Sequence, residues 1–133
     1  FFSADEAVRL WNMLLEAGKE EGLIPCGLAA RDSLRFEPCL PLYGDEIFAD
    51  IDPISARLGF FVRFDKAFIA KNALLKIKLE GPKQKLIGFE MVERGVPRHG
   101  YAILAPTGEK IGFVTTGMKA PTVGKFVGLG YVK

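Results

Sequence analysis

The chain has 133 residues, of which 49% are apolar and 26% are charged, and its formal net charge is +2. These shares are typical of a globular protein that is long enough to build a hydrophobic core of its own. The small net charge gives no support to a nucleic-acid-binding function. The apolar runs are too short to span a bilayer and the first residues lack a basic leader, so we expect no membrane partner and no signal peptide.

The ends of the sequence indicate a piece of a longer protein, and the spacing of its cysteines indicates free thiols. The chain opens on Phe1 rather than on methionine and stops at Lys133 within a predicted strand, so we expect a piece of a longer protein. Cys26 and Cys39 are thirteen residues apart, a spacing that fits neither a CxxC redox pair nor a zinc knuckle. We expect both cysteines to be buried free thiols in a reducing compartment.

The first predicted element is an amphipathic helix. Ser3 and Glu6 have the spacing of a capping box, in which each side chain bonds the backbone N–H of the other residue. Gly18 or Gly22 is expected to end the helix. One face of this helix is apolar and is expected to cover a sheet. That face comprises Ala7, Val8, Trp11, Leu14 and Leu15.

The next stretch is harder to assign. Residues 29–35 fit either a short helix or a strand, because helical spacing and alternation both describe them. Pro38 and Pro41 then require irregular backbone. Further on, Asp52 is expected to cap a short helix over residues 54–58, since a proline follows it in the first turn.

The middle of the chain is expected to hold a strand over residues 60–64 and a helix over residues 69–79. The clearest break follows at residues 80–82, which read Glu-Gly-Pro. We place a domain boundary at this break, which divides the chain into residues 1–81 and residues 82–133.

The residues after the break are predicted to be all-β. The expected strands cover residues 85–92, 101–104, 110–115 and 126–132, with a hairpin loop at 105–109 and a turn at 121–124. Gly128 and Gly130 in the last strand suggest bulges or barrel corners. Short strands separated by turns favour a small barrel or sandwich, here incomplete and with an open edge.

Arg31 is the candidate ligand-binding residue. It follows a turn of small residues, and its planar guanidinium suits an anion such as a carboxylate. Arg35 lies four residues further on, and Asp32 can pair with it across three residues. We therefore expect Asp32 and Arg35 to be scaffold. The alternative for Arg31 is a structural ion pair.

Other polar and aromatic residues carry weaker signals. His99 is the only histidine and lies in a predicted turn, so a backbone-bonded turn residue is favoured over a metal ligand or a general base. Arg94 and Arg98 flank the same turn and are expected to anchor the β-domain. Gly128 and Gly130 are not a dinucleotide fingerprint, since no helix follows them. Tyr43 and Tyr101 lie in predicted loops, and we expect their rings to pack against the protein and not to stack on a ligand.

Several motifs in a fixed order carry a family resemblance. They read C-G-L-A-A-R-D-S-L-R-F-E, L-P-L-Y-G, F-I-A-K-N-A-L, R-G-V-P-R-H-G-Y, I-G-F-V-T-T-G, A-P-T and V-G-L-G-Y-V. Together they resemble the aminomethyltransferase, or T-protein, of the glycine cleavage system over nearly the whole chain. Ala70 stands where that family often has glycine, which we interpret as a tolerated change.

The resemblance implies an α+β fold class. Residues 1–81 would be the end of an α/β folate-binding domain, and residues 82–133 an incomplete C-terminal β-barrel domain. The implied reaction moves the methylene carbon from the aminomethyl-lipoyl arm of the H-protein to tetrahydrofolate and releases ammonia. Tetrahydrofolate would be a co-substrate and no metal is required. The compartment would be the bacterial cytoplasm or the mitochondrial matrix.

The resemblance also implies roles for single residues. Arg31 matches the arginine of the A-R-D motif, which helps to hold folate in this family. The catalytic aspartate and a pterin-reading glutamate are expected upstream of Phe1, so no catalytic residue is expected within the chain. This piece would then carry one wall of the folate site, and the isolated fragment is expected to be inactive.

Alternatives from other classes stay open. Folate-dependent relatives in iron–sulfur assembly carry a K-G-C-Y-x-G-Q-E type motif, whereas residues 65–72 read D-K-A-F-I-A-K-N and hold no cysteine. The folate domains of sarcosine and dimethylglycine dehydrogenases are the runner-up within the class. A folate-binding or structural module without activity of its own is the alternative from a different class.

Overall fold

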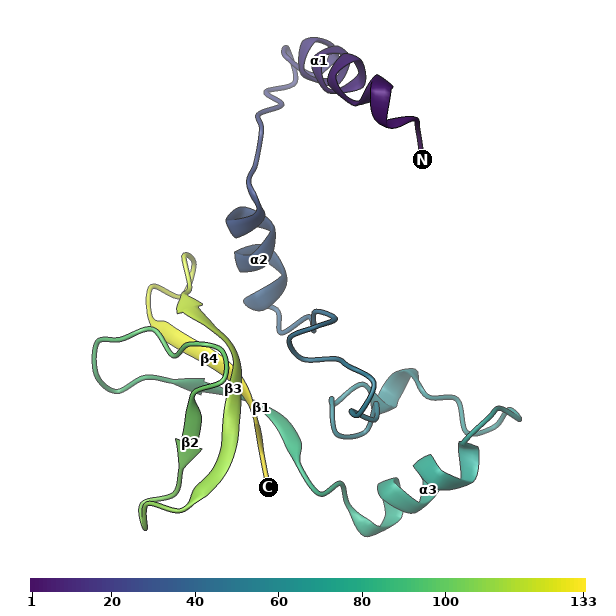
Figure 1. Cartoon of the computed structure of the whole chain (residues 1–133), viewed down its shortest axis with the longest axis vertical. Coiled ribbons are helices and arrows are strands. Elements are labelled where there is room, and N and C mark those ends of the chain that lie inside the picture. The colour runs from purple at the N-terminus through teal and green to yellow at the C-terminus, as the bar shows by residue number, and fades with distance from the viewer. The chain divides into compact units, whose positions relative to one another are not determined.

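The computed structural model describes all 133 residues. They form two compact units, Phe1–Asp32 and Ser33–Lys133. Figure 1 labels the helices and strands along the chain. In chain order the elements are the 3-10 helix η1 (Ala4–Glu6), α1 (Ala7–Ala17), α2 (Leu28–Phe36), the 3-10 helix η2 (Gly59–Phe61), α3 (Lys71–Glu80), β1 (Lys85–Glu90), β2 (Ala102–Leu104), β3 (Lys110–Lys119) and β4 (Phe126–Val132).

Helix α1 forms as predicted and ends at Gly18, but its capping box does not form. The Ser3 side chain makes no cap hydrogen bond, and Glu6 instead forms an ion pair with Arg9 one turn along. Arg9 offers Glu6 a charged partner, which competes with the weaker bond to a backbone N–H. On the apolar face of α1, Val8, Trp11 and Leu14 are exposed and Leu15 is half-buried. No helix in the structure has the length and apolar character needed to cross a membrane.

Helix α2 settles the choice between helix and strand at residues 29–35 in favour of the helix. The proline-rich residues after it are irregular, as predicted. Both cysteines are exposed, so the prediction that they are buried is wrong. Cys26 lies in the irregular segment before α2, and Cys39 lies in the turn after it with a left-handed φ of 59°. Neither position belongs to an element that packs on a core.

The segment around Asp52 is only partly as predicted. The Asp52 carboxylate accepts hydrogen bonds from the backbone N–H groups of Ile54 and Ser55, which confirms it as a cap. The capped turn does not extend into a helix, because Arg57 adopts a left-handed φ of 60°. The strand predicted at residues 60–64 is wrong, since the 3-10 helix η2 occupies its start.

Ala70 immediately precedes α3 and has a left-handed backbone, with φ of 65° and ψ of 11°. A side chain with a Cβ atom is strained there, by roughly 1–2 kcal/mol relative to a right-handed conformation. Glycine adopts this conformation without that strain. The glycine that the resemblance leads one to expect at this position therefore has a conformational reason.

Replacement of Ala70 by glycine is expected to stabilise the protein by about 0.5–1 kcal/mol, because relief of the left-handed strain exceeds the added entropy of the unfolded chain. Urea denaturation measures the difference. The matched control is Ala73→Gly, an exposed position inside α3, which should destabilise by about 0.5–1 kcal/mol. Equal loss of stability in both variants would contradict the explanation.

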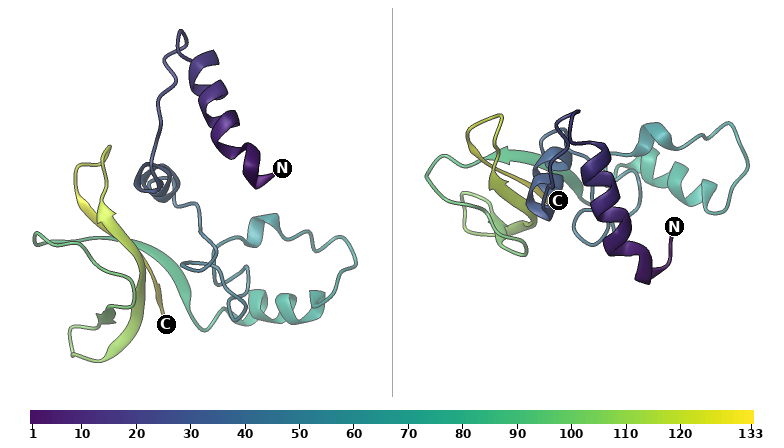
Figure 2. Two further views of the ribbon diagram at one scale, coloured as in Figure 1. Left: turned by 45° about the horizontal axis from the view of Figure 1, so that its top comes forward. Right: turned by 90° about the horizontal axis from the view of Figure 1, so that it is seen from above.

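The four strands form one antiparallel sheet in the order β1-β4-β3-β2. Two further views show how strongly the long strand β3 curves (Figure 2). The predicted hairpin loop between β2 and β3 is confirmed, with Gly108 at a positive φ of 84°. Strands β1 and β2 are the two edges of this sheet, as expected for a barrel wall that is not closed.

Bulges were one of two alternatives predicted for the glycines of β4, and they do not form there; the other alternative, barrel corners, stays a prediction. The bulge lies opposite them in β3, where Val114 pairs with Gly130 and Thr116 pairs with Leu129. The β4 glycines instead allow close approach. A Cβ atom on Gly128 would lie 2.4 Å from the Phe89 ring, and one on Gly130 would lie 2.7 Å from a backbone carbonyl oxygen.

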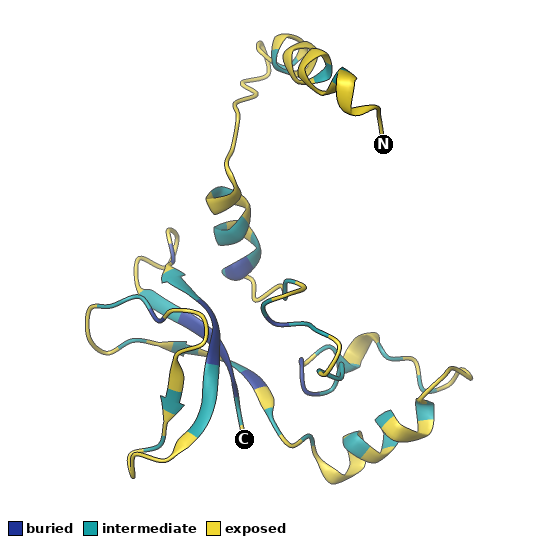
Figure 3. Ribbon diagram, viewed as in Figure 1, coloured by how far each residue is buried: buried dark blue, intermediate teal, exposed yellow.

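The hydrophobic core of the Ser33–Lys133 unit joins the last residue of α2 to residues of the sheet. Its buried residues are Phe36, Leu86, Leu129 and Tyr131. Figure 3 shows buried positions gathered along β3 and β4. Because Phe36 is the last residue of α2, the C-terminal end of that helix belongs to this core.

Candidate functional site

The most unusual feature of the Ser33–Lys133 unit is a fully buried carboxylate, that of Glu46, which has no exposed surface. Its Oε2 atom accepts a hydrogen bond of 2.6 Å from Nη1 of Arg35 and one of 3.0 Å from the backbone N–H of Leu42. An ionised group buried in this way requires a charged partner and further hydrogen bonds, because burial removes its hydration. Arg35 on α2 is that partner.

The other carboxylate oxygen of Glu46 faces the sheet. Its Oε1 atom accepts hydrogen bonds from the hydroxyl groups of Thr115, at 2.7 Å, and Thr116, at 2.5 Å. The Glu46 backbone carbonyl accepts a further hydrogen bond of 2.8 Å, donated by the hydroxyl group of Tyr131 in β4. We call these residues, Arg35, Glu46, Thr115, Thr116 and Tyr131, the Glu46 cluster.

The bulge in β3 explains how two neighbouring threonines reach one oxygen. In a regular strand, side chains of consecutive residues point to opposite faces of the sheet. Thr115 is the extra residue between the pairs that Val114 and Thr116 make with β4. The bulge re-aims its side chain, so both hydroxyl groups meet Glu46.

The charge state of the cluster follows from these contacts. Burial by itself would raise the pKa of Glu46, but the hydrogen bonds from Thr116, Leu42 and Thr115 and the positive charge of Arg35 outweigh it, so the pKa is lowered from its usual 4.5. Burial, helped by the negative charges of Glu46 and Asp52, raises the pKa of Tyr131 to about 12. Near neutral pH, Glu46 is therefore ionised and Tyr131 keeps its proton as a donor.

A lowered pKa makes folding stability depend on acid. Ionised Glu46 contributes stability above pH 4.5, and this contribution is lost as the pH falls through the lower pKa of the folded state. As the pH falls from about 7 to well below 4.5, we expect Glu46→Gln to lose less stability than the native protein, measured by urea denaturation. Some acid dependence should persist in the variant, because hydrogen bonds from Thr122 also lower the pKa of Glu37. An unchanged pH dependence would contradict the assignment.

Three consecutive residues attach the end of α2 to the sheet. Besides Glu46, Arg35 contacts Asp45 at 3.4 Å and the Thr116 hydroxyl at 3.1 Å. Phe36 is buried in the core, and the Glu37 carboxylate accepts a bond of 2.8 Å from the backbone N–H of Thr122. Arg35 is thus scaffold, as predicted, and its partners include residues of the sheet and of the loop after α2.

Arg31 lies in the first half of α2 and is exposed. Its backbone N–H donates to the carbonyl of Gly27, which belongs to the turn of small residues before the helix. An exposed guanidinium is compatible with binding a carboxylate or another planar anion. Its role as a folate ligand stays a prediction.

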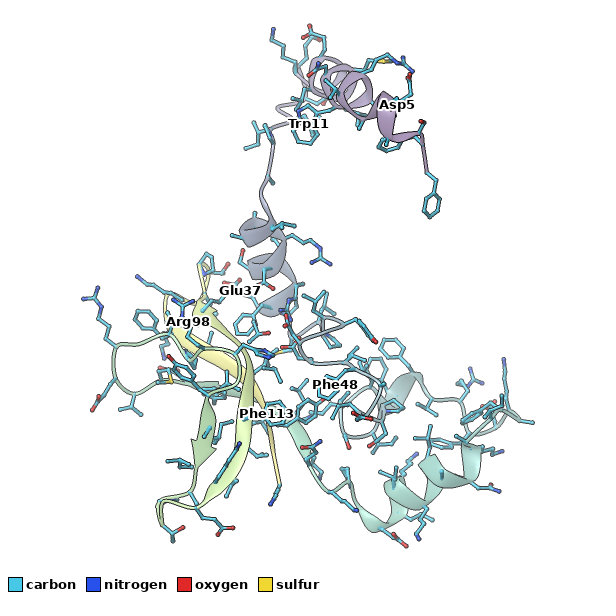
Figure 4. All side chains as sticks on the ribbon, viewed as in Figure 1. Asp5, Trp11, Glu37, Phe48, Arg98 and Phe113 are labelled. Carbon is cyan, nitrogen blue, oxygen red and sulfur yellow. The ribbon has the colours of Figure 1, made fainter.

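His99 behaves as the turn residue that was predicted. Its Nδ1 atom lies 2.7 Å from the carbonyl oxygen of Thr115, so the ring donates there, and it lies 3.8 Å from Asp45. Arg94 and Arg98 are both exposed, and Figure 4 shows Arg98 on the loop before β2. The arginine that bonds the sheet is Arg35, which donates a hydrogen bond to the Thr116 hydroxyl and forms its ion pair with Glu46 in the loop after α2.

Sequence reasoning missed Glu46, Thr115 and Thr116. The hydroxyl contacts of Glu46 span 69 and 70 residues, and no local spacing marks them. The one available signal was a polar Thr-Thr pair inside an otherwise apolar strand. Because every carboxylate oxygen of Glu46 is already hydrogen-bonded, the cluster is suited to holding structure and not to proton transfer.

Comparisons with known proteins agree on one family. Residues 1–66 match the family described as the GCVT N-terminal domain, and residues 84–133 match the glycine cleavage T-protein C-terminal barrel domain. A relative from Geobacillus sp. strain WCH70, named aminomethyltransferase, is 56% identical over 97% of this chain and 36% of its own length. One of the same name from Caldanaerobacter subterraneus subsp. tengcongensis is 57% identical over 96% of this chain and 34% of its own.

A solved structure gives the same result. The glycine cleavage system aminomethyltransferase T from Bartonella henselae is similar to this chain, with a TM-score of 0.76 and 38% identity. The similarity covers 80% of this chain and 30% of that protein. The chain therefore spans about a third of the length of the relatives that it matches.

Proposed function

This chain belongs to the glycine cleavage T-protein family, and on that premise we propose that it is a segment of an aminomethyltransferase. The whole protein takes the aminomethyl group carried on the lipoyl arm of the H-protein. It transfers the methylene carbon to tetrahydrofolate and releases ammonia. Holding the two reactants side by side supplies much of what such a transfer needs, because it replaces a chance encounter with a fixed geometry.

The observation that carries the proposal is the high identity to proteins named aminomethyltransferase along almost the entire chain. The same observation favours this activity over the folate domains of sarcosine and dimethylglycine dehydrogenases. The partners are the lipoylated H-protein and tetrahydrofolate. The relatives are bacterial, which favours the bacterial cytoplasm over the mitochondrial matrix as the site of the reaction.

Within this segment, Arg31 is the proposed folate-binding residue. Its exposed guanidinium can bind a carboxylate or a ring carbonyl of the folate through two parallel hydrogen bonds. The acid–base chemistry belongs to residues of the whole protein outside this segment, so residues 1–133 alone are expected to be inactive. We place residues 1–81 in the folate-binding domain and residues 82–133 in the barrel domain.

Replacement of Arg31 by alanine in the full-length protein is expected to weaken tetrahydrofolate binding about tenfold or more, which corresponds to about 1.4 kcal/mol. The reason is the loss of a charged, two-pronged hydrogen-bond donor. Isothermal titration with tetrahydrofolate measures the dissociation constant directly.

The matched control is Arg98→Ala, which removes an exposed arginine from a loop of the barrel domain. It should leave the dissociation constant unchanged. If the Arg31 and Arg98 variants bind tetrahydrofolate as tightly as the native protein, the folate role of Arg31 is wrong. If the native protein fails to bind tetrahydrofolate at all, the proposed function is wrong.

A further inference from the structure

We propose that a pocket beside strand β1 binds an extended segment of a partner protein, one that carries apolar side chains and a carboxylate. The segment would pair with the open edge of β1 at Gly88. We call this pocket the Gly88 pocket, and all of its residues belong to the compact unit that contains the sheet. This binding site does not depend on the activity proposed above. The residues around the pocket include Leu40, Arg57, Phe60, Phe61 and Gly88.

The Gly88 pocket has the size and the chemistry of a binding site. Its volume is about 350 Å³, which lies in the range of about 300–1,000 Å³ that is usual for ligand pockets. The aromatic side chains of Phe60 and Phe61 line it and are exposed. Arg57 is the only charged residue that lines it, and its guanidinium forms no ion pair within the chain. An apolar pocket with one unpaired cation suits an apolar ligand that carries a carboxylate.

Two residues of the pocket wall have a strained backbone. Three residues other than glycine have a left-handed φ, and two of them, Cys39 at 59° and Arg57 at 60°, line the Gly88 pocket. Glycine adopts this conformation without strain. Strained residues of this kind collect at ligand-binding sites, where the strain has a use. The chain thus keeps an arginine at the pocket in a conformation for which the fold alone would favour glycine.

Gly88 is the one glycine in the sheet that the fold does not require. A Cβ atom on Gly88 would lie 3.8 Å from Cδ2 of Leu129, which is an ordinary contact. On each of the other four strand glycines it would lie between 1.9 and 2.7 Å from a neighbouring atom. A glycine inside a strand weakens it and often marks a place where a ligand or another backbone approaches closely. The other four are Gly112, Gly117, Gly128 and Gly130.

Strand β1 is an edge of the sheet, and the backbone groups of Gly88 point away from the sheet. In an antiparallel pair, the N–H and C=O groups of alternate residues face the partner strand. The N–H of Leu86 donates to the carbonyl of Ser55, outside the sheet, whereas the N–H of Met91 donates to Phe126 in β4. Even-numbered residues of β1 therefore face outward, and neither backbone group of Gly88 has a partner in the chain. Such groups pair with an extended peptide that adds a strand to the sheet.

A second copy of the chain fits this edge less well than a single peptide segment. Two copies that pair antiparallel about Gly88 would place Leu86 of one copy opposite Glu90 of the other. Because the N–H of Leu86 already bonds Ser55, only the Gly88 pair could form its bonds. A single extended strand can pair with both Gly88 and Glu90. We therefore assign the edge to a peptide segment of a partner protein.

The first test is amide hydrogen exchange of the full-length protein, followed by NMR. In the free protein we expect the amide of Gly88 to exchange about 100-fold or more faster than that of Ile87, which faces β4. A slow Gly88 amide in the free protein would mean that another segment of the same protein covers the edge. That result would overturn the proposal.

The probe for binding is the synthetic peptide acetyl-Thr-Leu-Thr-Leu-Asp-amide, and isothermal titration with the full-length protein measures its affinity. We expect saturable binding that slows exchange of the Gly88 amide. Binding should be about tenfold weaker when lysine replaces the aspartate of the peptide. Absence of binding up to about 1 mM peptide, or equal affinity for the two peptides, would overturn the proposal.

The variant Gly88→Val tests the strand glycine directly. Valine suits a strand and its Cβ atom has room there, so circular dichroism should show an unchanged fold. The added side chain occupies the pocket and should weaken peptide binding about tenfold or more. The matched control is Gly95→Val, at a loop glycine outside the pocket with no atom within 4 Å of an added Cβ, and it should bind like the native protein. Equal affinity of the two variants would overturn the proposal.

The variant Arg57→Gly tests the charge without a loss of fold, because glycine relieves the left-handed strain. We expect this variant to bind the aspartate and lysine peptides equally. The control Arg63→Gly removes an exposed arginine outside the pocket and should keep the preference for aspartate. A preference for aspartate that survives in Arg57→Gly would overturn the proposal.

Sedimentation of the full-length native and Gly88→Val proteins separates the remaining occupant. We expect both proteins to have the same association state, because the edge binds a peptide segment and not a second copy. A native dimer that Gly88→Val converts to a monomer would overturn the proposal.

Discussion

Truncation of Glu46 to alanine is expected to lower the free energy of unfolding by about 3–5 kcal/mol, because it leaves the Arg35 charge without its buried partner. The substitution also leaves three donors without an acceptor. They are the hydroxyl groups of Thr115 and Thr116 and the backbone N–H of Leu42, which bond the carboxylate in the native protein. Buried donors without acceptors are costly because they have also lost water. This is the largest effect expected from a single side chain in the cluster.

Urea denaturation of the full-length protein, followed by circular dichroism, measures this loss. The control is Glu109→Ala in the exposed hairpin loop, which removes the same atoms and should change stability by less than about 0.5 kcal/mol. A loss below about 1 kcal/mol for Glu46→Ala would show that the buried pair contributes little.

The second large effect is expected at Gly112 in β3. A Cβ atom there would lie 1.9 Å from the backbone carbonyl oxygen of Tyr131 in the neighbouring strand. That carbonyl cannot retreat easily, since β3 and β4 are paired along most of their length. Gly112→Ala is therefore expected to destabilise the protein by about 3 kcal/mol, at the upper end of what overpacking costs.

The matched control for this change is Gly95→Ala, at a loop glycine with no atom within 4 Å of the added Cβ. It should be neutral or slightly stabilising, because alanine has fewer conformations in the unfolded chain. Thermal unfolding of both variants gives the comparison. Similar melting temperatures for the Gly112 and Gly95 variants would contradict the close approach of the two strands.

The β-sheet was largely predictable because its signals are local. Turn residues with a required backbone conformation, such as Gly108 and Gly124, mark the ends of strands, and both have positive φ in the structure. The strand predicted at residues 60–64 failed because two adjacent aromatic rings looked like part of an alternating pattern. In the structure the rings of Phe60 and Phe61 lie 3.8 Å apart, centroid to centroid, within a 3-10 turn.

The Glu46 cluster was not predictable from the sequence for the opposite reason. Its contacts join residues far apart in the chain, and one of them depends on a bulge that places Thr115 and Thr116 on the same oxygen. Such a bulge follows from the pairing of two strands and from no single segment. Arg35 could be assigned as scaffold from its spacing, but its buried partner could not be named.

At Ala70 the backbone conformation explains a departure from the residue that the family resemblance predicts. The resemblance alone identified a departure from glycine, and the left-handed backbone of this residue supplies the cause. The structure shows that Arg31 on α2 is exposed, whereas the prediction that its ligand is folate comes from the resemblance.

The most direct test of the central claim is a single-turnover reaction of the full-length protein with aminomethyl-lipoyl H-protein and tetrahydrofolate. We predict that methylenetetrahydrofolate and ammonia form in equal amounts, and that methylenetetrahydrofolate forms only when both substrates are present. If the folded protein binds tetrahydrofolate but no carbon reaches it from the H-protein, the aminomethyltransferase assignment is contradicted, and the protein is a folate-binding module.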